Sequence, residues 1–405
     1  MDSRQSSDPV LRATLQTLTK LISFPSVSST SNVAVNDYLA EQLEELGFAI
    51  SRTEYLDPND VQKSNLVAVR PPVSGSLAGG GLAYFCHTDV VPVNRGTGPV
   101  SEKTGTQKTA APDSPADPFQ AILSDDRLYG RGACDMKGSA ACMLSAIKQI
   151  DPAQQTAPLW FVATADEEVG FVGAKHMVGH CAGYAQLAAA DPVAIIGEPT
   201  SLNIVYAHKG IAGFRVVSQG RAGHSATNIG INANEAMVPM LETLLQLSQQ
   251  SRGEGALQDS RFDPSHLSWN FGVSDHCNTL NITPGRSTAW VSLRAMPEIS
   301  GQGLIDVART KAAELGLELE MIDGCAPLWN DPDCEHLQEL QSLTGTQLQT
   351  ACYATDGGVL EQLSRRVVIG PGSIEQAHTV DEWISLEQLQ QGTKVFHDAI
   401  FKWCT

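Results

Sequence analysis

Three consecutive carboxylates, Asp166, Glu167 and Glu168, follow an apolar run in the segment PLWFVATADEEVG. The apolar run predicts a buried strand, so the three acids are expected where that strand ends. Crowded carboxylates repel one another and resist desolvation, and a fold keeps them only beside a compensating cation or proton. Two adjacent glutamates also point in different directions, so one can bind a metal ion while its neighbour moves a proton. The tripeptide therefore indicates a metal site.

Four further segments place an imidazole or a carboxylate just beyond an apolar strand or at a loop-to-helix junction. They are His87 in AYFCHTDVVP, Asp135 in LYGRGACDMKG, Glu198 in AIIGEPT and His378 in VVIGPGSIEQAHTVDEW. With Glu168 they form a mixed nitrogen and oxygen ligand set at the carboxyl edge of a predicted α/β sheet, where such sheets bind ligands. This set suits zinc, with cobalt or manganese as alternatives. One carboxylate bridging two ions would create a two-metal hydrolytic site.

Each of these residues also has an ordinary structural explanation. A histidine after a strand is often structural, although Asp89, two residues beyond His87, could orient the imidazole toward a metal. Asp135 could instead cap the helix predicted just after it. Glu198 and His378 could be incidental polar residues of loops. The metal hypothesis therefore depends on whether the fold brings these side chains together.

Several competing hydrolase classes are excluded by their missing motifs. The sequence contains no HExxH helix, no GxSxG elbow and no GxxxxGK[ST] phosphate loop. It contains nine cysteines without a CxxC pair, which favours reduced and mostly buried thiols. Cys86 and Cys134 stand beside candidate ligands, but each neighbours a residue of harder ligand type, so we do not expect them to bind the metal.

The elements that must position these residues fall into two patterns. Residues 1–207 alternate helical and strand periodicity, which predicts an α/β fold with a mostly parallel central sheet and helices on both faces. Residues 208–324 combine two helices with several antiparallel strands, which predicts a small inserted α+β domain. Residues 325–405 return to the first domain. The stretch from Asn94 to Asp117, rich in Gly, Thr, Ser, Pro and Lys, predicts a long surface loop.

Bulk composition describes an ordinary globular protein. Of 405 residues, 42% are hydrophobic and 18% are charged, and the formal net charge is -18 at pH 7. This charge opposes binding to nucleic acid or to anionic membranes. No apolar stretch approaches the roughly 20 residues that span a bilayer, and the N-terminal residues lack the pattern of a signal peptide. We therefore expect a cytoplasmic protein with neither a nucleic-acid nor a membrane partner.

Seven segments resemble, in order along nearly the whole chain, those of one family of dinuclear zinc metallopeptidases. They are HTDVVP, GRGACDMKG, ATADEEVG, IIGEPTSL, AHKG, GRAGHSA and GPGSIEQAHTVDE. The family includes acetylornithine deacetylase, succinyl-diaminopimelate desuccinylase, aminoacylases and several carboxypeptidases, and IIGEPTSL, AHKG and GPGSIEQAH are most similar to its acetylornithine deacetylase branch. The resemblance implies a zinc-peptidase-like catalytic domain and an inserted lid domain through which two copies form a homodimer.

The resemblance also implies roles for the candidate ligands. Asp135 would bridge two zinc ions, with Glu168 and His378 completing the shell of one ion and His87 and Glu198 that of the other. Glu167 would be the general base. The spacing of Asp89 from His87, not the resemblance, suggests that Asp89 supports catalysis by orienting His87. The resemblance further implies a cis peptide bond between Asp135 and Met136.

For the substrate, the resemblance assigns residues in both domains. His224 in GRAGHSA would reach the active site of the partner copy and stabilise the oxyanion, while Arg294 and Asn281 would hold a substrate carboxylate. Without the resemblance, all three would be ordinary turn, surface or strand residues. Gly372 of the Gly-Pro-Gly turn is also assigned to substrate binding.

The segment ATDGGVLEQL departs from the acetylornithine deacetylase pattern and leaves the substrate more open. We hypothesise that Asp356 or Glu375 pairs with a distal ammonium of the substrate. The alternative for Asp356 is a simple turn residue before Gly-Gly.

The expected activity is hydrolysis of an N-acyl amino acid, with N-acetyl-L-ornithine first, giving L-ornithine and acetate in arginine biosynthesis. The alternatives are N-succinyl-diaminopimelate desuccinylation or a general aminoacylase or dipeptidase activity. A non-catalytic scaffold protein is disfavoured because Glu167 and all five candidate ligands are present.

Overall fold

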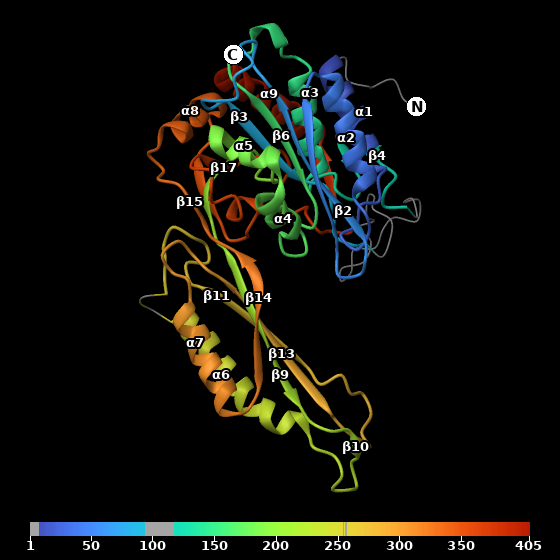
Figure 1. Ribbon diagram of the computed structural model, residues 1–405, viewed down its shortest axis with the longest axis vertical. Helices are drawn as coiled ribbons and strands as arrows, with labels where there is room; N and C mark the ends of the chain where they lie inside the picture. Colours follow the sequence, from blue (N-terminus) through green and yellow to red (C-terminus); the bar gives the residue numbers. More distant parts are fainter. Residues whose placement is uncertain (1–7, 94–116, 254, 256) are drawn as a thin grey trace. The chain divides into compact units, whose positions relative to one another are not determined.

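The computed structural model of the chain describes residues 8–93, 117–253, 255 and 257–405 (Figure 1). Apart from Asp117, the surface loop predicted between Asn94 and Asp117 lies outside these residues. No helix in the described ranges combines the length and the apolar character needed to cross a membrane.

The chain divides into two compact units. The first unit contains the chain up to Tyr206, together with Asn330–Gln349 and Thr355–Thr405. The second unit contains Ala207–Trp329 and the short segment Thr350–Ala354. Compared with the predicted limits 1–207, 208–324 and 325–405, the second unit therefore ends at Trp329 and includes one additional segment.

The first unit contains most of the helices. They are α1 (Pro9–Ile22), α2 (Val33–Glu45), α3 (Lys137–Ile147), α4 (Val172–His180), α5 (Ala182–Ala190), α8 (Glu335–Thr344) and α9 (Leu386–Cys404), with 3₁₀ turns η1 (Pro152–Gln154) and η2 (Asp356–Gly358). Its strands are β1 (Ala49–Leu56), β2 (Gln62–Arg70), β3 (Leu82–His87), β4 (Ile122–Ser124), β5 (Arg127–Tyr129), β6 (Leu159–Thr164), β7 (Val193–Ile196), β17 (Arg366–Val368) and β18 (Trp383–Ser385). The strands β8 (Ile204–His208) and β16 (Leu348–Ala351) each contain a boundary between the units, and β15 (Leu328–Trp329) lies at the end of the second unit.

The central sheet is mixed and mostly parallel around the candidate site. Its strands follow the order β1-β2-β6-β3-β7-β17-β8-β15, and β16 also pairs with β8. The neighbouring strands β6, β3, β7 and β17 run parallel to one another, whereas β1, β2 and β8 pair antiparallel. Every residue of β3, β6 and β7 is buried, as expected for parallel strands covered on both faces. The predicted α/β fold is confirmed.

Helices cover both faces of this sheet (Figure 1). On one face, α4 and α5 pack on β1 and β2. On the other face, α1, α3 and α9 pack against one another, and α3 and α9 contact β3. The aromatic rings of Tyr84, Phe161 and Phe396 meet in the core between the sheet and α9. This three-layer arrangement fixes the strand ends that carry the candidate ligands.

The second unit is an antiparallel α+β structure. Its elements are β9 (Ile211–Gln219), β10 (Gly223–His224), α6 (Ala233–Arg252), β11 (Ser268–Ser274), β12 (Ile282–Thr283), β13 (Arg286–Arg294), α7 (Gln302–Glu314) and β14 (Glu318–Cys325). Four strands form an antiparallel sheet in the order β11-β13-β9-β14, and α6 and α7 pack against it. The predicted inserted domain with two helices is therefore present. In the segment HCNTLNIT, residues 276–283, only Ile282 and Thr283 form a strand, β12, and just before this segment Asp275 accepts a hydrogen bond from the Cys277 N–H.

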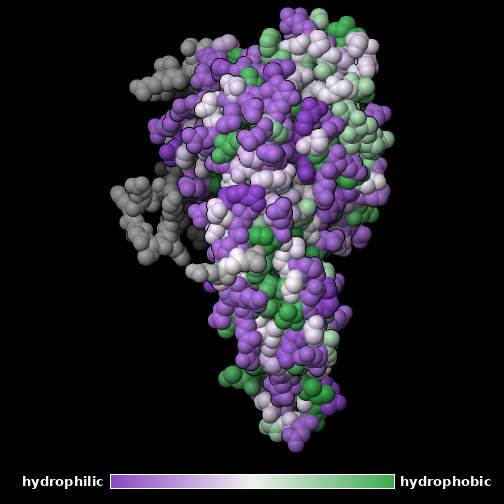
Figure 2. Space-filling model, turned by 90° about the vertical axis from the view of Figure 1, so that its left-hand side faces the viewer, coloured by the Kyte–Doolittle hydropathy of each residue, from purple (hydrophilic) through white to green (hydrophobic). Residues whose placement is uncertain are grey.

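The surface of the second unit mixes hydrophobic and hydrophilic residues (Figure 2). Large exposed side chains include Val238 and Leu245 of α6 and Val307 of α7, with exposed fractions of 62%, 49% and 51%.

Candidate metal and catalytic site

Four adjacent parallel strands deliver the candidate ligands to one edge of the central sheet. His87 is the last residue of β3, and Glu168 follows β6 by four residues. Glu198 follows β7 by two residues, and His378 lies in the loop that follows β17. Because the carboxyl ends of parallel strands share one edge, residues far apart in the sequence converge there. Asp135 reaches this edge from the loop that precedes α3.

Asp135 lies at the centre of the cluster and faces a histidine on each side. Its Oδ1 atom is 3.0 Å from His87 Nε2, and its Oδ2 atom is 3.3 Å from His378 Nε2. His87 Nε2 is also 3.9 Å from Glu198 Oε1, and His378 Nε2 is 3.0 Å from Glu168 Oε2. The five side chains therefore form two histidine–carboxylate pairs, His87 with Glu198 and His378 with Glu168, on either side of one shared aspartate.

Asp135 does not cap the helix that follows it. The N-cap of α3 is Met136, and Asp135 makes no capping hydrogen bond. The peptide bond between Asp135 and Met136 is cis, as the resemblance implied. His378 adopts a left-handed backbone conformation with φ of 63°, which is uncommon outside glycine and frequent at functional sites.

A carboxylate and both histidines of the cluster have shifted pKa values. Burial raises the pKa of Glu198 well above its usual value, and Asp135 and Glu168 add to this shift. Hydrogen bonds with Asp135 and Glu168 raise the pKa of His378 to about 10. Burial opposes charge on His87, yet its hydrogen bond to Asp135 and the nearby charge of Glu198 raise its pKa well above the usual value. Each of these shifts favours a bound proton at the cluster, and divalent cations would compete with such protons for the same side chains.

The donor set fits divalent metal ions. Ligand atoms of His87, Asp135 and Glu168 lie within 4.8 Å of one another, close enough to share one small site. Imidazole nitrogens and carboxylate oxygens are donors that zinc accepts readily. By contrast, the thiols of Cys86 and Cys134 donate to the backbone carbonyl groups of Val162 and Ser373. The observed cluster therefore consists of nitrogen and oxygen donors.

Glu167 lies beside the cluster and is held there through its backbone. Its N–H donates to Asp89 Oδ1 at 3.1 Å, and Ser28 Oγ donates to the other oxygen of Asp89 at 2.8 Å. Burial raises the pKa of the Glu167 carboxyl well above its usual value, and the carboxylates of Glu198, Asp356 and Glu168 contribute to this shift. A carboxyl group poised in this way is suited to accept and release a proton.

Asp89 orients His87 in a different way from the one expected. The His87 Nδ1 atom is 2.9 Å from the backbone carbonyl oxygen of Asp89 and 3.7 Å from its carboxylate. The carbonyl group therefore fixes the tautomer that leaves Nε2 free to face Asp135. The carboxylate instead positions the backbone of Glu167.

Two buried ion pairs support the site and had no signal in the sequence. Lys63 donates to Asp166 Oδ1 at 2.7 Å, and Tyr55 donates to Asp166 Oδ2 at 2.7 Å. These contacts hold Asp166 in a left-handed conformation with φ of 54° just before Glu167. The second pair joins Arg131 to Glu382 at 2.7 Å, behind the loop that carries Asp135. In both cases the partners come from distant segments, so no local pattern reveals them.

The substrate residues predicted in the first unit lie at different depths. Asp356 is buried and accepts a hydrogen bond from Thr164 Oγ1 at 2.6 Å, whereas Glu375 is exposed. Thr355, not Asp356, caps the η2 turn, so the simple turn explanation does not account for the Asp356 side chain. Gly372 is buried against Cys134, and its N–H donates to Gln388 Oε1. The substrate contacts of these residues remain predictions.

The substrate residues predicted in the second unit lie at two ends of its structure. His224 belongs to β10, which pairs with β12, and the carbonyl of Asn281 accepts a hydrogen bond from the Ser225 N–H. Arg294 is the last residue of β13, opposite Ser268 of β11. The structure therefore brings His224 and Asn281 together and separates both from Arg294.

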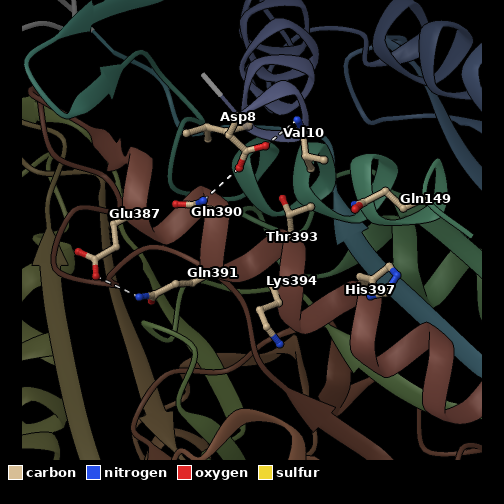
Figure 3. A pocket seen from close by; sticks show the side chains of 10 residues that line it. Asp8, Val10, Gln149, Glu387, Gln390, Gln391, Thr393, Lys394 and His397 are labelled. Carbon is tan, nitrogen blue, oxygen red and sulfur yellow. Dashed lines mark hydrogen bonds between the residues drawn. The ribbon is translucent and has the colours of Figure 1, made fainter. Parts of the chain in front are cut away.

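A polar hollow of about 450 Å³ lies elsewhere on the first unit, where the start of α1 meets α9 (Figure 3). Asp8 accepts hydrogen bonds there from the Val10 N–H and from Gln390 Nε2, and Glu387 accepts one from Gln391. None of the candidate metal ligands lines this hollow.

Similarity to known proteins agrees with the geometry of the site. Residues 83–402 match the model of Peptidase family M20/M25/M40. The acetylornithine deacetylase of Pasteurella multocida (strain Pm70) is 32% identical over 409 aligned residues, covering 96% of this chain and 98% of that protein. The acetylornithine deacetylase of Proteus mirabilis (strain HI4320) is 33% identical, covering 95% of each chain.

Solved structures show the same fold at lower sequence identity. Human carnosine dipeptidase 1 superposes with a TM-score of 0.70 at 17% identity, covering 97% of both chains. The dipeptidase Dug1p of Saccharomyces cerevisiae superposes with a TM-score of 0.72 at 14% identity, covering 96% of this chain and 97% of that one. A third structure, the YXEP protein of Bacillus subtilis, is described as a dinuclear metal binding peptidase and has a TM-score of 0.62 at 14% identity over 97% of this chain and 98% of its own. By its fold, the match along its sequence and its histidine–carboxylate cluster, the chain belongs to peptidase family M20/M25/M40, a family of metallohydrolases.

Proposed function

We propose that this chain is a two-metal hydrolase of N-acyl amino acids, with N-acetyl-L-ornithine as its first candidate substrate. The observation that carries this proposal is the position of Asp135 between two histidine–carboxylate pairs, with Glu167 beside them. The names of the relatives support the choice of acyl group and amino acid. By this assignment the enzyme acts in the cytoplasm, in arginine biosynthesis.

The residues of this chain would divide the work between holding ions and moving a proton. His87 and Glu198 would hold one ion, Glu168 and His378 the other, and Asp135 both. Bound zinc, cobalt or manganese ions would polarise the amide carbonyl and lower the pKa of water toward ~7. Glu167 would then accept the proton of the attacking water and deliver it to the nitrogen of the leaving amine. Because its backbone is fixed by Asp89, its carboxylate can serve both steps with little movement.

Asp356 is our candidate for recognising a cationic side chain of the substrate. Its Oδ1 atom is buried and has no hydrogen-bond partner among the described residues. Burial raises the pKa of Asp356 to about 6, opposed by the Thr164 hydrogen bond. A buried carboxylate oxygen without a donor is costly, and a substrate ammonium would remove that cost.

A matched pair of substrates tests this assignment. We expect the zinc-loaded protein to release acetate from N-acetyl-L-ornithine about 10–100-fold more efficiently than from N-acetyl-L-norvaline, which lacks only the distal amine. Asp356→Asn should raise KM for the ornithine substrate and leave the norvaline substrate unchanged. Steady-state kinetics on both substrates and on N-succinyl-diaminopimelate give the answer. Equal efficiency on the matched pair would refute cation recognition, and preference for the succinyl substrate would make the chain a desuccinylase.

The geometry of the second unit supports a contribution of His224 from a second copy of the chain. The start of β13 at Arg286 pairs with Gln219, close to His224, whereas Arg294 lies eight residues further along the strand. At the rise of a β-strand this separation is roughly 26 Å. Two side chains so far apart are poorly placed to hold one small substrate from the same subunit. If Arg294 binds the substrate carboxylate, we propose that His224 acts across a homodimer.

Complementation between two inactive variants tests whether His224 acts within its own subunit or across a homodimer. We expect His224→Ala and Glu167→Gln to be inactive separately, because each lacks one part of the site. When they are co-expressed in equal amounts, half of the dimers should be mixed and contain one complete site, restoring about a quarter of the wild-type activity. No recovery in a mixed dimer verified by affinity tags would show that His224 does not act across subunits.

A further inference from the structure

The buried carboxylate of Glu382 is surrounded by four hydrogen-bond donors. Its Oε2 atom accepts from Arg131 Nη1 at 2.7 Å and from the Gly132 N–H at 2.9 Å. Its Oε1 atom accepts from the Cys134 N–H at 2.9 Å and from the Asp135 N–H at 3.0 Å. The side chains of Arg131 and Glu382 are 3% and 1% exposed. Four donors match the acceptor capacity of one ionised carboxylate, so the carboxylate of Glu382 is fully satisfied.

The same two residues also connect the loop of Asp135 to the loop of His378. Arg131 Nη2 donates to the Thr379 carbonyl at 3.0 Å, directly beside His378. The backbone carbonyl of Glu382 accepts from the Gly130 N–H at 3.1 Å, and β18 continues from Glu382 along β5. The two candidate ligands therefore stand on loops that meet through one charged, hydrogen-bonded junction.

Ordinary packing does not require this junction. A buried ion pair contributes little net stability compared with apolar residues of the same shape, because both charges lose their hydration. It does fix geometry, since a carboxylate with two donors on each oxygen permits one position of the loop. Glu382 itself is not one of the five candidate metal ligands.

We propose that Glu382 and Arg131 are a positioning pair that sets the spacing between Asp135 and His378 and thereby the affinity and geometry of the metal site. This inference deepens the proposed function and rests on the proposed metal site. Neither residue touches substrate or metal, and both act through the loops of Gly132–Asp135 and His378–Thr379.

The decisive variant is Glu382→Gln, which keeps the size of the side chain. Glutamine leaves one acceptor oxygen for four donors and turns an NH₂ group toward two of them. We expect a loss of about 10–100-fold in affinity for at least one ion, as for other residues that orient metal ligands. We also expect kcat to fall more than KM rises, and the visible absorption of the cobalt-loaded protein to shift. Arg131→Lys, which keeps the charge and loses the fork, should show a smaller change in the same direction.

Leu340→Ala in α8 is the matched control for lost stability. Leu340 is fully buried in the core of the same unit, so its truncation lowers the melting temperature without touching either loop. Metal affinities from competition with a chelator and the cobalt spectrum should be unchanged in this control. If Glu382→Gln and Arg131→Lys both match Leu340→Ala in these measurements, losing only stability, the positioning role is refuted. A wild-type protein that binds fewer than two ions would instead overturn the proposed function, and the inference with it.

Discussion

Replacement of Glu167 by glutamine is expected to lower kcat by about 10²–10⁴-fold, the usual contribution of a general acid–base group. Glutamine has the shape of glutamate but cannot take a proton from water or return it to the leaving nitrogen. The hydrogen bond to Asp89 is donated by the backbone N–H of residue 167, so the variant should keep its local structure. Steady-state turnover of N-acetyl-L-ornithine, with metal content determined on the same sample, measures the effect.

Metal content decides how a loss of activity in this variant is interpreted. We expect Glu167→Gln to retain two ions per chain, because Glu167 is not one of the five proposed ligands. Glu44→Gln, an exposed position on α2, serves as a control that should change neither activity nor metal content. Wild-type activity in Glu167→Gln would refute the proposed proton transfer, and loss of an ion would make residue 167 a ligand.

Removal of Asp135, the proposed shared ligand, should reduce the metal content at least as strongly as replacement of Glu167 reduces turnover. Asp135→Ala deletes both oxygens that face His87 and His378, so we expect the bound metal to fall from two ions to fewer than one per chain, with no detectable turnover. Asp135→Asn keeps one carbonyl oxygen and should retain one ion more tightly than the other. Elemental analysis after dialysis against a weak chelator measures both variants.

The carboxylate of Asp126 provides a control of the same chemical type. Its side chain is 77% exposed between β4 and β5, and its replacement by asparagine should leave the metal content unchanged. Circular dichroism should show that Asp135→Ala retains the fold, since Asp135 contributes donors to the cluster and no cap to α3. Two tightly bound ions in Asp135→Ala would refute a shared aspartate.

Sequence patterns could predict that the candidate ligands would come together, because most of them stand at the ends of apolar runs. His87 ends β3, and Glu168 and Glu198 follow β6 and β7 within four residues; these strands are fully buried, and their apolar runs are visible in the sequence. Parallel strands then deliver these residues to one edge as a consequence of topology. This pattern alone could not identify Asp135 as a candidate ligand, because an aspartate before a helix is more often a cap.

The supporting contacts could not be predicted in this way. Glu382 and Arg131 are about 250 residues apart in the chain and meet only because β18 pairs with β5. Lys63 reaches Asp166 from β2, a strand whose sequence shows no reason for a buried cation. Such pairs depend on the three-dimensional arrangement of segments far apart in the chain, and the periodicity of a single sequence carries no information about it.

If Asp135 is shared by two metal ions, anomalous diffraction from crystals of the zinc-loaded protein should show both ions directly. We expect two peaks ~3.5–4 Å apart, one beside His87 and Glu198 and the other beside Glu168 and His378, with Asp135 touching both. A single peak, or two peaks away from Asp135, would contradict a shared aspartate.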